Sequence, residues 1–164
     1  MKNRRTAPQA GQESVWDYPR PPRLEASSKH IRVEFAGKII ADTRRAFRVL
    51  ETSHPPVYYL PAEDIRMEHL KETSRSTFCE WKGRARYFTV AVGQCIAERS
   101  AWSYPRPTVS FQSIKDYLAF YAEQMDLCSV DGEAVQPQEG NFYGGWITSD
   151  IVGPFKGAPG NWGW

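Results

Sequence analysis

Short segments in which apolar and polar residues alternate recur along the middle of the chain, with turn residues between them. In the first of them, Ile31, Val33 and Phe35 alternate with charged residues, and Gly37 follows as a turn residue. Similar short segments cover residues 39–41, 47–52, 57–60, 87–92, 95–98, 125–130 and 133–135. Strands at this spacing, separated by turns, predict a compact antiparallel β-sandwich or open barrel.

Two of the turns have residues typical of tight β-hairpins. Gly93-Gln94 and Asp131-Gly132 each separate two predicted strands, and Asp-Gly is the stronger of the two signals. One or two short helices are predicted as well. One begins at Pro61 and runs towards Leu70, and one or two helical turns at 112–116 lead into a strand. The predicted fold class is therefore mainly β, with few helical residues.

The two ends of the chain differ from its middle in composition. Residues 1–13 are polar and without periodicity, which predicts a disordered N-terminus. Residues 14–30 contain three prolines among four residues, so we expect an extended, proline-rich arm there. Residues 31–139 then form a single β domain. Residues 140–164 are rich in Gly and Trp, and we expect this extension to pack on the domain.

Large aromatic side chains support this view of the extension. Exposed aromatic side chains here would form an aggregation-prone patch. We therefore expect burial against the β domain for Trp146, Phe155 and Trp162. A second aromatic feature is an internal echo, because 14–21 and 100–107 agree at six of eight positions. We interpret the echo as two copies of one aromatic–proline packing device.

Charge and hydropathy exclude several classes of protein. The net charge is +2, and there is no block of like charges such as a nucleic-acid-binding tail carries. No apolar stretch approaches the ~20 residues of a membrane helix. We therefore expect a cytoplasmic protein without a nucleic-acid or membrane partner, and we allow for a weak homo-oligomer.

Metal and cofactor motifs are missing from the sequence. The three cysteines, Cys79, Cys95 and Cys128, are far apart and form no Cys-x-x-Cys pair. The sequence also lacks a P-loop, a Gly-x-Gly-x-x-Gly fingerprint and a His-Glu-x-x-His motif. We predict three reduced thiols, no metal and no cofactor.

Segment 77–83 contains several chemically different functional groups within a few residues. It joins the thiol of Cys79 to Glu80, Trp81, Lys82 and Gly83. A neighbouring lysine favours a reactive thiolate, which is one interpretation. The other, which we prefer, is a loop that leads into a strand, with Gly83 at an unusual backbone angle and Trp81 in the core.

Several rare motifs follow one another in a recognisable order: Val57-Tyr-Tyr-Leu-Pro61, Asp64-Ile-Arg-Met67, Thr77-x-Cys-x-Trp-Lys-Gly83, Ala101-Trp-Ser-Tyr104 and Ala119-Phe-Tyr121. Over residues 31–130 or so, the chain resembles the bacterial family called domain of unknown function 427. The resemblance implies an antiparallel fold similar to the β-tent domains. It also brings the label "nucleotidyltransferase-like". The chain lacks the paired carboxylates of metal-dependent nucleotidyl transfer and the Cys-x-x-Cys pairs of zinc-bearing β-tent relatives.

The first functional hypothesis is a module that binds a small ligand, which could be anionic or nucleotide-like. Members of the β-tent group bind ligands in aromatic cages, and the chain carries many aromatic residues beside proline. Lys82 or Arg106 would contact an anion. The residues that we expect to bind the ligand are Tyr59, Trp81, Lys82, Gly83, Trp102 and Tyr104.

Two other hypotheses stay open. The chain could be a group-transfer enzyme, in which Lys82 contacts phosphate and Glu80, Asp64 or Glu98 serves a metal or acts as a base. No catalytic residue can be assigned from the sequence. The chain could also be a structural or protein-interaction domain. Carboxylates that converge in one cleft would favour the enzyme, whereas an open aromatic cage without them would favour binding.

Overall fold

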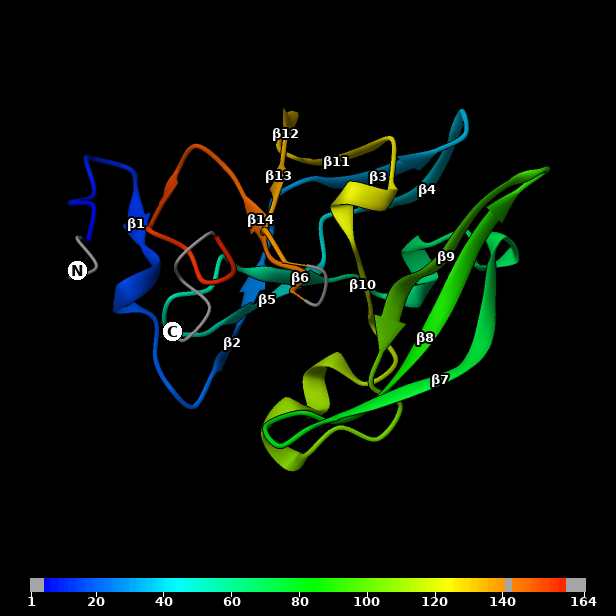
Figure 1. Ribbon diagram of the computed structural model, residues 1–164, viewed down its shortest axis with the longest axis horizontal. Helices are drawn as coiled ribbons and strands as arrows, with labels where there is room; N and C mark the ends of the chain where they lie inside the picture. Colours follow the sequence, from blue (N-terminus) through cyan, green and yellow to red (C-terminus); the bar gives the residue numbers. More distant parts are fainter. Residues whose placement is uncertain (1–4, 141–142, 159–164) are drawn as a thin grey trace.

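The structure is a computed structural model that describes residues 5–140 and 143–158. Its regular structure is almost entirely β, with short 3-10 turns (η) between the strands (Figure 1). The mainly β fold predicted from the sequence is confirmed. The strands of the three larger sheets are β7 (Leu70–Cys79), β8 (Gly83–Val92), β9 (Cys95–Ser103) and β10 (Leu118–Phe120); β2 (Arg23–Ser27), β5 (Ala46–Leu50) and β6 (Val57–Tyr59); and β3 (Ile31–Phe35), β4 (Lys38–Thr43), β11 (Leu127–Val130) and β12 (Glu133–Ala134).

Two antiparallel layers enclose the main core. The order in the first sheet is β10-β9-β8-β7, and a bridge between Leu60 and Leu118 joins its β10 edge to the sheet β2-β5-β6. The other four-stranded sheet has the order β12-β11-β3-β4. Buried residues from all three sheets form one apolar cluster, which includes Ile31, Phe88 and Phe120. Among the described residues, β7 and β2 each pair with a single strand, so the layers close no barrel.

Both predicted hairpin turns are confirmed. Val92 pairs with Cys95 across Gly93-Gln94, and Val130 pairs with Glu133 across Asp131-Gly132. The backbone of Asp131 and Gly132 has φ angles of 49° and 84°. Two successive positive φ angles are what the tightest hairpin turn requires, and Asp-Gly accepts them readily.

Two strands of the three larger sheets, β2 and β7, were not predicted because few of their side chains are buried. Most side chains of β7 face solvent, and β2 has no fully buried residue. Alternation of apolar and polar residues arises where one face of a strand is buried, so these edges carry little of that signal. β2 begins directly after the prolines, where we expected an extended, proline-rich arm.

The predicted helices are short 3-10 turns. The segment that begins at Pro61 forms two of them. The turns predicted at 112–116 overlap the last residues of a third, Val109–Ile114, and a strand, β10, follows at Leu118. None of the helices in the described ranges is long and apolar enough to cross a membrane. The five turns are η1 (Val15–Asp17), η2 (Ala62–Asp64), η3 (Met67–His69), η4 (Val109–Ile114) and η5 (Ala122–Gln124).

The two terminal segments pair with each other. β1 (Glu13–Ser14) lies parallel to β15 (Ile151–Val152), and the Thr6 amide donates to the Gly153 carbonyl at 2.9 Å. This differs from the disordered N-terminus that the polar composition predicts, although residues 1–4 lie outside the described residues. A further short pair, β13 (Gln136–Pro137) and β14 (Trp146–Ile147), leads the C-terminal segment back to the core.

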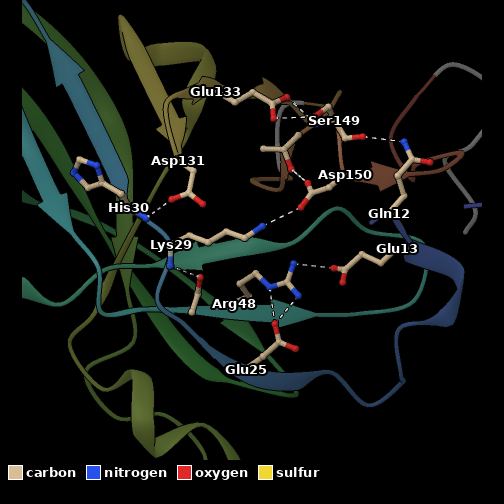
Figure 2. A network of polar contacts seen from close by, with 12 residues as sticks. Gln12, Glu13, Glu25, Lys29, His30, Arg48, Asp131, Glu133, Ser149 and Asp150 are labelled. Carbon is tan, nitrogen blue, oxygen red and sulfur yellow. Dashed lines mark hydrogen bonds and ion pairs between the residues drawn. The ribbon is translucent and has the colours of Figure 1, made fainter. Parts of the chain in front are cut away.

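A polar network joins these segments to β5 and to the connection between β2 and β3 (Figure 2). Arg48 is buried, and its guanidinium donates to Glu13 at 2.8 Å and, through Nε, to Glu25 at 2.9 Å. Lys29 donates to Asp150 at 2.9 Å. Charged groups from the N-terminal segment, from β2 and from the C-terminal segment are thus joined around one arginine and one lysine.

The C-terminal extension supplies part of the core, as expected. Trp146 is 1% exposed, its ring stacks on Tyr58 at a centroid distance of 5.3 Å, and its Nε1 donates to the Phe120 carbonyl at 3.1 Å. Phe155 is half-buried and packs against a separate small cluster that contains Val15. The expectation for Trp162 falls outside the described residues.

The internal echo of sequence does not mark one repeated packing device, and that interpretation is wrong. Residues 100–103 lie within β9, whereas residues 14–17 run from the end of β1 into η1. The Nε1 of Trp102 donates to the Tyr59 hydroxyl, while that of Trp16 donates to the Pro154 carbonyl. The two similar segments therefore adopt different backbone structures.

Candidate functional site

A partly open cavity of about 310 Å³ lies beside the end of the β7–β8 hairpin. Its walls come from strands β6, β7, β8 and β9, from the loop after β5 and from the segment before β14. Aromatic side chains predominate among the lining residues, which are Glu51, His54, Val57, Tyr59, Thr77, Phe78, Cys79, Glu80, Trp81, Lys82, Tyr87, Trp102, Tyr104, Tyr121, Gln138, Tyr143 and Gly144.

Strand register creates the aromatic floor of the cavity. Tyr87 on β8 lies directly opposite Trp102 on β9, and directly opposite residues point to the same face of a sheet. Trp102 in turn contacts Tyr121 at a centroid distance of 4.5 Å and Tyr59 at 6.4 Å. Tyr59 also contacts Tyr104 at 6.2 Å. These five rings are buried by one another, so they form a firm surface.

Three tyrosine hydroxyl groups of the floor are held in the neutral form. Burial, before any other cause, raises the pKa of Tyr59, Tyr104 and Tyr121 above the ordinary value of 10.0. The Trp102 Nε1 donates to the Tyr59 hydroxyl at 3.2 Å, and the Tyr87 hydroxyl lies 3.0 Å from Thr77 Oγ1. The floor therefore combines apolar ring area with uncharged hydrogen-bonding groups.

The turn between β7 and β8 forms one rim of the cavity. The Lys82 ammonium lies 5.8 Å from the centre of the Tyr104 ring, within the range of a cation–π contact. The turn is tied to the chain that follows β9, because the Thr108 hydroxyl donates to the Trp81 carbonyl at 2.6 Å and the Thr108 amide to the Lys82 carbonyl at 3.1 Å. Trp81 and Lys82 are both half-buried.

Gly83 shapes this rim without lining the cavity. Its φ of 104° is a conformation that residues with a Cβ rarely adopt, and a Cβ there would lie 3.0 Å from the Arg106 carbonyl oxygen. Arg106 itself is exposed and does not line the cavity. The structure thus brings together five of the six predicted ligand-binding residues, Tyr59, Trp81, Lys82, Trp102 and Tyr104, and places Gly83 behind them.

The opposite rim was missed in the sequence. His54 lies in the loop between β5 and β6, and its ring meets that of Tyr143 edge-on at a centroid distance of 5.8 Å. Gln138 accepts from the Gly145 amide at 3.1 Å and donates to the Lys156 carbonyl at 2.8 Å. Gly144 approaches the Trp102 ring so closely that a Cβ would collide with it. Only the fold reveals that these segments meet.

The carboxylates proposed for group transfer do not converge. Asp64 bonds to Arg45 at 2.9 Å, Glu80 lies on the rim of the aromatic cavity, and Glu98 lines a separate surface hollow with Arg99. Within residues 5–140 and 143–158, no group of three His, Cys, Asp or Glu side chains is placed to hold a metal ion. The cysteines lie on β7, β9 and β11, and the expectation that no zinc binds stays a prediction.

The comparison with protein families adds one finding. The model of NTP_transf_9, described as a domain of unknown function (DUF427), matches residues 23–131. The chain belongs to the DUF427 family. No protein with a curated description matches it. The DUF427 match begins at β2 and includes the aromatic floor, the Lys82 rim and His54, whereas Gln138, Tyr143 and Gly144 lie beyond it.

Proposed function

We propose that this DUF427 chain binds a small, flat molecule with an anionic group in the aromatic cavity. One observation carries the proposal: rings from several separate chain segments surround one open cavity that has an ammonium group at its rim. A mostly apolar hollow with a few polar groups is the usual form of a small-molecule site.

The dimensions and chemistry of the cavity support this class of ligand. Its volume of about 310 Å³ is close to the lower end of the range of small-molecule sites, roughly 300–1,000 Å³, which suits one ring system with a substituent. The rings of Trp102 and Tyr104 offer apolar area to a flat molecule, and the neutral tyrosine hydroxyls offer hydrogen bonds without charge.

The charges at the rim favour an anion. The Lys82 ammonium lies over a ring of the cavity, where an anionic substituent can reach it. Glu51, on the opposite side, lies 3.5 Å from Arg20, which offsets its charge. Glu80 is exposed to solvent, and its charge is therefore screened by water.

A thermal-shift screen of the full chain against nucleotides, aromatic carboxylates and sugar phosphates tests the proposal. We expect a hit that also quenches tryptophan fluorescence. Lys82→Ala should weaken its binding at least tenfold and change stability by less than about 0.5 kcal/mol, because a half-exposed lysine contributes little to folding. Lys38→Ala, at the exposed first residue of β4, is the matched control.

Two results would contradict the proposal. One is a best hit that binds equally well to Lys82→Ala and to the control. The other is a screen without any hit, which would leave a structural or protein-interaction domain as the better hypothesis. Group transfer, the remaining alternative, gains no support from the positions of Asp64, Glu80 and Glu98.

A further inference from the structure

His54 presents one defined hydrogen-bonding group at the rim opposite Lys82. Its Nδ1 lies 3.0 Å from the Thr52 carbonyl oxygen. A carbonyl oxygen only accepts hydrogen bonds, so Nδ1 carries the proton. In a neutral imidazole the other nitrogen, Nε2, is then an acceptor with a lone pair.

The surroundings of His54 keep the ring neutral near pH 7. Burial lowers the pKa of the imidazole below its ordinary value of 6.5, Glu51 and the Thr52 carbonyl oppose this, and Lys156 and Arg20 add to the lowering. No hydrogen bond between described residues uses Nε2. A lining residue of the cavity thus has an acceptor that bonds to no other residue within 5–140 and 143–158.

The ring is also held in place. The His54 amide donates to the Glu51 carbonyl at 3.0 Å, and the ring meets Tyr143 edge-on. Tyr143 is covered in turn by Lys156, whose ammonium lies 5.6 Å from the ring centre and whose amide donates to the Ser53 carbonyl at 2.9 Å. A fixed ring gives its acceptor a fixed direction, which makes a hydrogen bond selective.

The two rims therefore differ in chemistry. Lys82 supplies hydrogen-bond donors and a positive charge, whereas His54 supplies an acceptor. A molecule that satisfies both needs an anionic group at one end and an N–H or O–H group at the other, joined by a flat body that covers the aromatic floor.

We propose that His54 Nε2 accepts a hydrogen bond from the ligand, and that the ligand class is an anionic heteroaromatic molecule with an N–H donor on its ring. This inference rests on the proposed function, since it assigns chemistry to the same cavity. His54 is then a residue that determines specificity.

Matched pairs of probes test the inference on the full chain. The first pair is indole-3-carboxylate and 1-methylindole-3-carboxylate, and the second is inosine 5′-monophosphate and its 1-methyl derivative. The two members of a pair have the same charge and the same ring system. In the methylated member, a methyl group replaces the hydrogen of the N–H donor. By calorimetric titration at pH 7.5, we expect the N–H member of at least one pair to bind tenfold or more tightly than its methylated partner.

A variant separates the lost hydrogen bond from the added bulk of the methyl group. His54→Phe keeps an aromatic ring beside Tyr143 but removes the acceptor, so the preference for the N–H member should fall to about twofold or less. His69→Phe, at the end of η3 and outside the cavity, is the control and should keep the full preference.

A measurement on the unaltered protein covers the case in which His54→Phe does not fold. In long-range ¹H–¹⁵N spectra, the His54 Nε2 resonance should move when the N–H member binds and not when its partner does. Three outcomes would overturn the inference and leave the proposed function intact. The first is equal affinity for the two members of both pairs, and the second is a preference for the N–H member that persists in His54→Phe. The third is a screen hit outside this ligand class while neither pair binds. A screen in which nothing binds would instead remove the proposed function.

Discussion

At the scale of single residues, candidates that stand in local motifs were predictable, and those brought to the cavity by distant contacts were not. Trp81, Lys82, Trp102 and Tyr104 stand in two unusual local motifs, so the sequence itself marks them. His54 lies in a loop that carries no motif, and its ring contacts that of Tyr143, which is far away in the chain. Contacts of this kind arise from the fold, and a local pattern does not encode them.

The backbone at Gly83 provides a prediction at this scale. Gly83→Ala should lower the free energy of unfolding by about 2–3 kcal/mol, because a Cβ at a φ of 104° is strained and approaches the Arg106 carbonyl. Gly93→Ala, at a φ of 58° and with nothing near the added Cβ, should cost only about 1 kcal/mol. Urea denaturation measures both values. Equal costs would mean that the β7–β8 turn tolerates a side chain.

At the scale of elements, a strand can be predicted from the sequence when one of its faces is buried. β3 and β8 each have a buried face and alternate accordingly, and the hairpin turns that follow them carry clear turn residues. β2 and β7 lie at edges, and the pairing of β1 with β15 depends on residues at opposite ends of the chain. Arg48 makes long-range hydrogen bonds to Glu13, which begins β1, and to Glu25 on β2. No local sequence pattern predicts such contacts.

Acid should weaken the link between Arg48 and the N-terminal segment. Burial opposes ionisation of Glu13, but hydrogen bonds from Arg48 and Tyr18 outweigh it and lower the pKa below the ordinary 4.5. The ionised carboxylate therefore stabilises the fold at pH values above about 4.5, and this contribution is lost as the pH falls through the lowered pKa.

Thermal denaturation between pH 7 and pH 3 measures this contribution. Glu13→Gln should lower the melting temperature at pH 7 by a few degrees and reduce the further loss on acidification. Glu68→Gln, on the exposed turn η3, should leave the pH profile unchanged. If Glu13→Gln and Glu68→Gln gave the same profile, the carboxylate of Glu13 would not stabilise the fold.

At the scale of the whole molecule, the C-terminal extension belongs to the core. Its three tryptophans predicted that it packs on the domain, and Trp146 lies among residues of all three larger sheets. The extension also brings Tyr143 and Gly144 to the cavity, so fold and candidate site depend on the same segment.

Trp146→Ala should therefore destabilise the whole domain. We expect a loss of about 3–5 kcal/mol, which combines the lost burial, the cavity left behind and an unpaired Phe120 carbonyl. Trp81→Ala, at the half-buried rim, should cost about 1 kcal/mol or less. Equilibrium unfolding in guanidinium chloride measures both. A small effect at Trp146 would show that the extension packs weakly.

The central claim, that the aromatic cavity is a binding site, is tested most directly by the tryptophan indole N–H signals in ¹H–¹⁵N spectra during titration with the best hit from the screen. Trp102 lies on the floor and Trp81 on the rim, while Trp16 and Trp146 lie elsewhere. We predict saturable shifts of the Trp81 and Trp102 signals, with those of Trp16 and Trp146 unchanged. Shifts confined to Trp16 or Trp146 would contradict the account.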